Sequence, residues 1–111
     1  MGYVRHNAII ATGWQGEAVD ALVAYATNLG AEVLRGAEQI NGYITACITP
    51  DGSKEGWPSS KEGDAQRKKI REWLNAADSR GQYFEWCEVV YGSDDAAASV
   101  VESAWQESTH D

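Results

Sequence analysis

The dipeptide Asn41-Gly42 constrains the fold of this chain more than any other feature of its sequence. It lies between two strand-like runs, residues 31–40 and 43–49. Asn-Gly is favoured in type I′ turns, because both central residues of such a turn have positive φ, and these turns join antiparallel strands. In the second run every second residue is apolar and is expected to face the core. These residues are Ile44, Ala46 and Ile48. The sequence therefore predicts an antiparallel hairpin with one buried face.

A strand and a helix flank this hairpin on each side. Residues 3–12 and 83–91 are rich in β-branched and aromatic residues and are predicted strands. Residues 15–28 and 60–77 carry apolar residues at helical spacing and are predicted helices. A last helix is predicted over 95–107, capped by Ser93 or Asp94, from five apolar residues at helical spacing: Ala97, Val100, Val101, Ala104 and Trp105.

The order β-α-β-β-α-β is that of the ferredoxin-like, split βαβ fold. We therefore expect an α+β protein with a four-stranded antiparallel sheet in the order 4-1-3-2. Two helices cover one face, and the added C-terminal helix covers the other face or extends an edge. The 111 residues form one domain, 1–111, in which 108–111 are an expected frayed tail. Strand 1 then separates Cys47 from Cys87 by more than the reach of a disulfide.

The segment 50–59 is longer than a connection between a strand and a helix requires. Its Pro, Gly and Ser residues exclude regular structure, yet it carries Trp57. In the predicted topology it leaves the end of the sheet where strand 1 begins and strand 4 ends. This convergence gives a candidate set of ligand-binding residues: His6, Asp51, Ser53, Lys54, Trp57 and Tyr91. Stacking on Trp57 and the charge of Lys54 would suit an anionic small molecule, although Trp57 could equally plug the end of the core.

The net charge is −8, and residues 83–111 hold seven acids with no Lys or Arg. We call residues 83–111 the acidic segment. Such a segment repels nucleic acid and attracts basic surfaces, so direct nucleic-acid binding is not expected. The candidate protein-binding residues are its acids on or near the predicted last helix: Asp94, Asp95, Glu102 and Glu107.

The sequence predicts neither an enzyme nor a bound cofactor or metal. His6 is the only histidine outside the tail, and no local signature of a nucleophile accompanies it. One histidine and two separated cysteines do not form a zinc set. A small enzyme that uses His6 with a loop carboxylate remains the last alternative. No apolar run approaches the ~18 residues of a membrane span, and the N-terminus lacks the apolar region of a signal peptide, so we expect a cytoplasmic protein that does not bind membranes.

Four strings in the chain resemble those of a group of short phage and prophage accessory proteins with a PDGSKEGW-type loop, for which no activity is known. The strings are Pro50-Asp51-Gly52-Ser53-Lys54-Glu55-Gly56-Trp57, Gly63-Asp64-Ala65-Gln66-Arg67, His6-Asn7-Ala8-Ile9 and Tyr91-Gly92-Ser93-Asp94. The resemblance implies a phage accessory product that acts in the cytosol of a bacterial host. Small acidic products of that kind often counter host defence.

Together these features predict a non-enzymatic, anti-CRISPR-like inhibitor. It would bind a host defence protein with a basic surface that handles nucleic acid. The alternative is a small-ligand module that sequesters an anionic nucleotide signal. The sequence leaves open whether the chain forms a homodimer.

Overall fold

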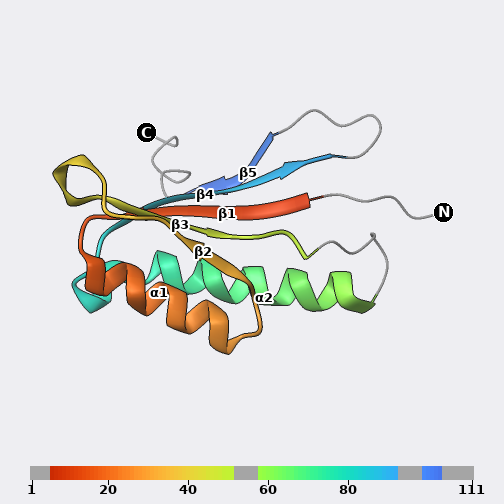
Figure 1. Ribbon diagram of the computed structural model, residues 1–111. Helices are drawn as coiled ribbons and strands as arrows, with labels where there is room; N and C mark the ends of the chain where they lie inside the picture. Colours follow the sequence, from red (N-terminus) through yellow and green to blue (C-terminus); the bar gives the residue numbers. More distant parts are fainter. Residues whose placement is uncertain (1–5, 52–57, 93–98, 104–111) are drawn as a thin grey trace, which may run out of the picture.

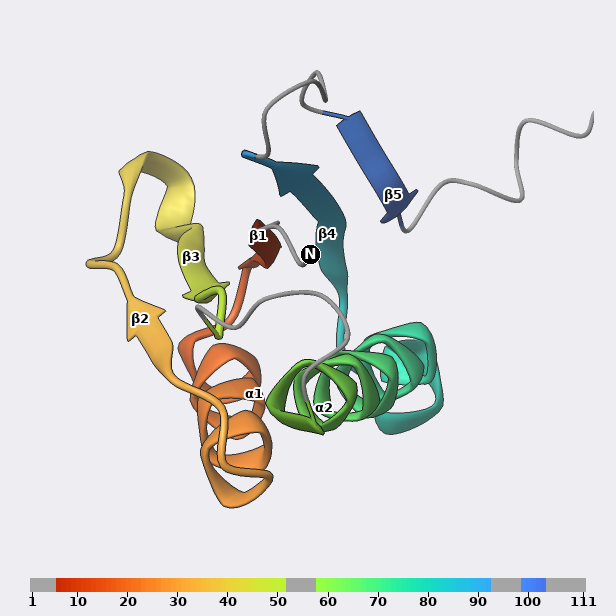
Figure 2. The same ribbon diagram turned by 90° about the vertical axis from the view of Figure 1, so that its right-hand side faces the viewer.

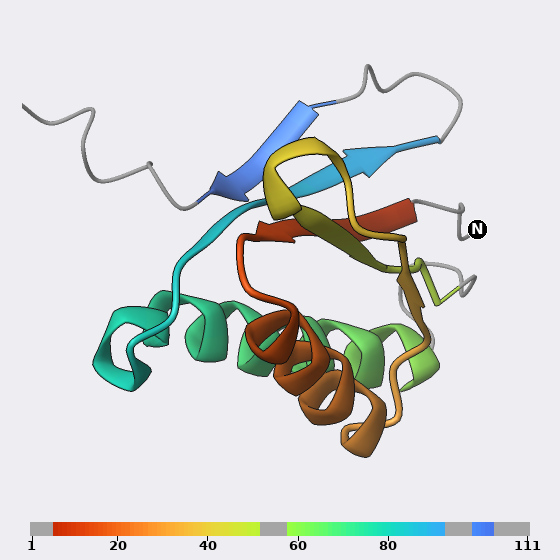
Figure 3. The ribbon, with the colours of Figure 1, turned by 60° about the vertical axis from the view of Figure 1, so that its left-hand side comes forward.

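The computed structural model of the chain describes residues 6–51, 58–92 and 99–103, with the backbone alone at 58–60, 99 and 102. Its helices and strands, in chain order, are β1 (His6–Gly13), α1 (Gly16–Asn28), β2 (Val33–Arg35), β3 (Ile44–Ile48), α2 (Pro58–Asn75), β4 (Phe84–Tyr91) and β5 (Ser99–Ser103). Short 3-10 turns follow β2 (η1, Ile40–Gly42) and α2 (η2, Ala77–Arg80). All neighbouring strands pair antiparallel, in the order β2-β3-β1-β4-β5. Both helices lie against one face of this sheet (Figures 1 and 3), so the protein is an α+β fold with a five-stranded antiparallel sheet.

The order of the first four strands and the antiparallel pairing of β2 with β3 agree with the sequence prediction. The tight hairpin does not, because the strand predicted over 31–40 is only Val33–Arg35. Asn41 and Gly42 do have positive φ, 69° and 80°, but they lie in η1, within a longer connection closed by a hydrogen bond from Gln39 N–H to the Tyr43 carbonyl. The first four strands have the expected order, and Ile10 of β1 lies between Cys47 and Cys87 in the register. Both cysteines are free and half-buried.

The prediction of a helix over 95–107 is wrong, because residues 99–103 form β5 at the edge of the sheet. The β-branched pair Val100 and Val101 favours a strand, and serine is a poor helix former. Pairing with β4 also satisfies backbone groups that β4 would otherwise leave unpaired. A β-bulge interrupts this pairing between Glu88 and Val89. The remainder of the predicted helix and the frayed tail lie outside the described residues.

The core lies between the two helices and the sheet. In β1, alternate residues such as Ile9 and Ala11 are buried against the helices, whereas Ile10 is exposed on the opposite face. Helix α1 contributes Val19 and Leu22 to the core. Burial of one large aliphatic side chain contributes about 2 kcal/mol. The alternation therefore fixes which side chains of each strand point toward the helices and which toward the other face, here called the open face.

Candidate functional site

The described parts of the three chain segments predicted to converge lie at one end of the domain, whereas residues 52–57 of the long loop lie outside the described residues. The start of β1, the end of β4 and the segment after β3 lie at the same end, beside the start of α2 (Figure 1). The sheet nevertheless divides the predicted ligand-binding residues between its two faces.

His6 and Tyr91 lie together on the open face. They are register partners at the ends of β1 and β4, and their ring centroids are 5.2 Å apart at a tilt of 43°. Gly92 follows with φ of 86°, and a Cβ atom there would lie 2.8 Å from His6 Cδ2. The close packing of the His6 ring therefore requires glycine at position 92.

Asp51 points to the other face, into the space beside α2. Its Oδ2 accepts a hydrogen bond of 3.2 Å from Arg67 Nη1. A Cβ atom on Gly63 of α2 would lie only 1.9 Å from Asp51 Oδ2. Glycine inside α2 therefore provides the space that the Asp51 carboxylate occupies. His6 and Asp51, which the alternative enzyme hypothesis paired, are not brought together.

A buried ionic network continues from Arg67 into the sheet. The Arg67 and Glu88 side chains are only 7% and 3% exposed, and Arg67 Nε lies 3.6 Å from Glu88 Oε2. Glu88 also accepts hydrogen bonds from Arg71 Nη1 and, at 3.1 Å, from Asn7 Nδ2. Arg67 Nη2 donates to Asp64 on the preceding turn of α2. Buried charges require such partners, because an unpaired charge in the interior is strongly destabilising.

Sequence reasoning missed this network. Arg71 of α2 and Glu88, one of the seven acids of the acidic segment, contribute to the contact between α2 and β4. The available signal was spacing, because the buried stripe of α2 runs Gly63, Arg67, Ile70, Leu74. Because an arginine is conventionally assigned to the exposed side of a helix, this spacing alone does not predict a buried Arg67.

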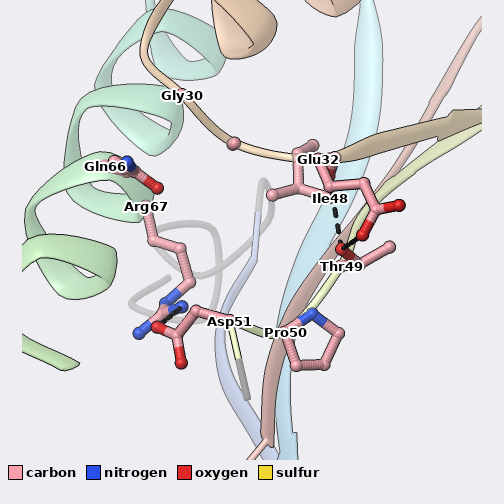
Figure 4. A pocket seen from close by; sticks show the side chains of 9 residues that line it. Gly30, Glu32, Ile48, Thr49, Pro50, Asp51, Gln66 and Arg67 are labelled. Carbon is pink, nitrogen blue, oxygen red and sulfur yellow. Dashed lines mark hydrogen bonds and ion pairs between the residues drawn. The ribbon is translucent and has the colours of Figure 1, made fainter. Parts of the chain in front are cut away.

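A pocket of about 250 Å³ opens beside the network (Figure 4). It lies between the end of α1, the end of β3 and α2, and its lining includes Glu32, Thr49, Asp51, Gln66 and Arg67. Thr49 Oγ1 donates to Glu32 Oε1 at 3.1 Å, and Gln66 Nε2 donates to the Leu29 carbonyl at 3.0 Å. The one cation in this lining, Arg67, is already ion-paired with acids. These lining residues therefore give the pocket little attraction for an anion.

Several predicted residues lie outside the described part of the chain: Ser53, Lys54, Trp57, Asp94, Asp95 and Glu107. Of the remaining predicted residues, Glu102 lies in β5, where it is the register partner of Glu88. Glu85, in the same acidic segment, is exposed and accepts a hydrogen bond of 3.2 Å from the Tyr83 hydroxyl. Reduced solvation and the Glu85 carboxylate, assisted by Tyr43, raise the pKa of Tyr83.

Comparisons with known proteins return no match, whether to protein-family models, to curated proteins or to solved structures. Within residues 6–51, 58–92 and 99–103, no group of three or more His, Cys, Asp or Glu side chains could hold a metal ion. None of the helices there is long and apolar enough to cross a membrane.

Proposed function

We propose that the protein is a non-enzymatic accessory protein of the phage type that binds and inhibits a basic, nucleic-acid-handling host defence protein. In this proposal it acts in the bacterial cytosol in the manner of an anti-CRISPR protein. The observation that carries the proposal is the edge position of β5 within the acidic segment.

An edge strand presents backbone donors and acceptors to which an extended segment of another protein can add as a further strand. Natural edges are commonly protected by lysine or proline, and β5 contains neither. Its sequence instead includes Glu102 and two exposed valines, Val100 and Val101. A strand with these properties suits a partner segment that is extended and basic.

Charge near this edge supports the same partner chemistry. Exposed Glu85 on β4 accepts a hydrogen bond from the Tyr83 hydroxyl, a group without positive charge. The arginines of α2 that contact β4, Arg67 and Arg71, are engaged by the buried Glu88. A basic surface would be drawn to this part of the molecule, mainly through a faster association rate.

The test compares two double variants that change the net charge equally. Glu85→Lys with Glu102→Lys alters the β4–β5 edge, whereas Glu62→Lys with Glu72→Lys alters exposed positions on α2. The assay is inhibition of target-DNA binding by a purified, guide-loaded CRISPR effector. We expect the edge variant to weaken inhibition by about tenfold or more and the α2 variant to retain it within about twofold. Absence of inhibition by the native chain, or equal loss in both variants, would contradict the proposal.

A second candidate function is sequestration of an anionic nucleotide in the pocket beside Asp51. The size of the pocket and its place next to the predicted ligand-binding loop favour it, whereas the ion-paired state of Arg67 does not. Thermal-shift measurements with a panel of nucleotides separate the two functions. A bound nucleotide raises the melting temperature by mass action, and no shift with any nucleotide would exclude this second candidate.

We also propose that β1 to β4 and the two helices form a ferredoxin-like core to which β5 adds an edge. The order β2-β3-β1-β4 and the packing of both helices on one face support this grouping (Figure 2). In that view the core is the scaffold and β5 carries the binding function.

A further inference from the structure

The open face of the sheet carries a row of apolar residues that crosses β2, β3, β1 and β4 and ends on a serine in β5. Lateral register partners place their side chains on the same face of a sheet. From β2 to β5, the register aligns Leu34, Cys47, Ile10, Cys87 and Ser103. Ile10, on the central strand, is 40% exposed, and Leu34, near the opposite edge from β5, is 59% exposed.

Charge is scarce on this face. Within β1 to β4, Glu85 is the only Asp, Glu, Lys or Arg among its residues, which are His6, Ala8, Ile10, Thr12, Leu34, Thr45, Cys47, Glu85, Cys87, Val89 and Tyr91. The whole chain is 23% charged, so this face is depleted of charge. In an antiparallel sheet with one face in solvent, polar residues of the exposed face normally alternate along each strand with apolar residues of the buried face. The open face instead has the composition of a surface that is covered.

The open face is not uniform across its width. A shallow, widely open hollow of about 340 Å³ lies on the β4–β5 side of the row, lined by Ile10, Thr12, Glu85, Trp86, Cys87 and Ser103. On the β2 side of the same row lies the exposed side chain of Leu34. One side of the face therefore offers a shallow depression and the other an exposed apolar side chain.

We propose that the open face packs against the same face of a second copy of the chain. Two chains of net charge −8 repel each other, and a face almost free of charge is where they can meet at the lowest electrostatic cost. A two-fold axis parallel to β1 places the β2 side of one copy over the β4–β5 side of the other. Leu34 of the second copy then fills the hollow beside Ile10, and the contact occurs twice by symmetry.

The available area fits a dimer of moderate affinity. From standard strand spacing and rise, the five strands have a footprint of about 450 Å². Side-chain relief makes the accessible area larger than the footprint. The two copies together then bury about 1,000 Å² or more, near the lower bound of specific interfaces. The dimer is therefore expected to dissociate at micromolar concentrations. It uses side chains of the open face rather than the backbone groups of the β5 edge, although Glu85 and Ser103 belong to both proposed contacts.

Sedimentation of the full chain between about 1 µM and about 500 µM tests this dimer. We expect a monomer at the low end and a dimer at the high end. Leu34→Asp and Ile10→Asp should remain monomeric throughout, and Ile40→Asp, at a position 88% exposed in η1, should behave as the native chain. Because Leu34 lies on an edge strand and is largely exposed, its variant stays informative if Ile10→Asp unfolds. A native chain that is monomeric throughout, or a dimer that survives Leu34→Asp, overturns the proposal.

The two native thiols supply an independent readout, because Cys47 and Cys87 both lie on the open face. Their rate of maleimide modification should fall at least severalfold as the protein concentration rises through the dimer range. Burial raises the pKa of the Cys47 thiol, so each thiol must be compared with itself across concentrations. Rates that do not change with concentration contradict the dimer.

Discussion

The contact between Asp51 and Gly63 depends on the absence of a Cβ atom at position 63. Glycine inside a helix is destabilising by about 1 kcal/mol relative to alanine. At position 63, however, the site of a Cβ atom is already occupied by the Asp51 carboxylate, 1.9 Å away. The loss of helix propensity is therefore offset by the ion pair between Asp51 and Arg67, which this close approach permits.

For Gly63→Ala, helix propensity and packing predict changes of opposite sign in the free energy of unfolding. Propensity alone predicts a gain of about 1 kcal/mol in the free energy of unfolding. A Cβ atom would displace the end of the Asp51 side chain from Arg67. The lost ion pair predicts a net loss of about 1–2 kcal/mol, which urea unfolding would measure.

The matched control is a double-mutant cycle with Asp51→Ala. Removal of the carboxylate frees the space, so Gly63→Ala should then be neutral or stabilising. If Gly63→Ala stabilises the native background as well, Asp51 does not occupy the space beside α2 as described.

At the scale of elements, α2 is joined to the sheet by charge as well as by apolar packing. Ile70 and Leu74 supply the apolar contacts. Arg67, one turn before Ile70, reaches Glu88 on β4 and Asp51 after β3. One side chain thus connects the helix to a strand and to the segment at the start of the long loop.

Arg67→Met tests this connection because methionine retains much of the apolar stem and removes the charge. We expect a loss of about 1–3 kcal/mol in the free energy of unfolding, since buried Glu88 loses one of its two arginine partners while Arg71 and Asn7 remain. Lys69→Met, at an exposed position on the same helix, should change stability by no more than about 0.5 kcal/mol. Equal effects of the two substitutions in urea unfolding would mean that the network does not stabilise the contact between α2 and β4.

The elements that sequence could predict are those with strong local signals. The Asn41-Gly42 turn, the alternation in β3 and the apolar stripe of α1 each specify a local structure. The fifth strand was missed because the apolar spacing of residues 97–105 also fits a helix, and only pairing with β4 decides between the two. The candidate site was predicted in part: sequence brought His6 and Tyr91 to the correct end, but the side of the sheet to which Asp51 turns depends on Arg67 and Gly63.

For the whole molecule, the structure separates three surfaces by their chemistry. The helix-covered face contains the core and the ionic network. The open face is almost uncharged and carries apolar residues across its centre, and it is the proposed contact with a second copy. The β5 edge, within the acidic segment, is the proposed contact with a basic host protein. The first contact uses side chains of the open face and the second uses backbone groups of β5, with Glu85 and Ser103 common to both.

Amide hydrogen exchange of the full chain, with and without a purified, guide-loaded CRISPR effector, tests whether the β5 edge binds the effector. If a basic segment of the effector adds to the β5 edge, its backbone hydrogen bonds should slow exchange in residues 99–103. Exchange in β2, at the opposite edge of the sheet, should be unchanged and serves as the internal control. Unchanged exchange in residues 99–103 when the effector is present in excess, or protection confined to β2 or α2, would contradict binding of the effector at the β5 edge.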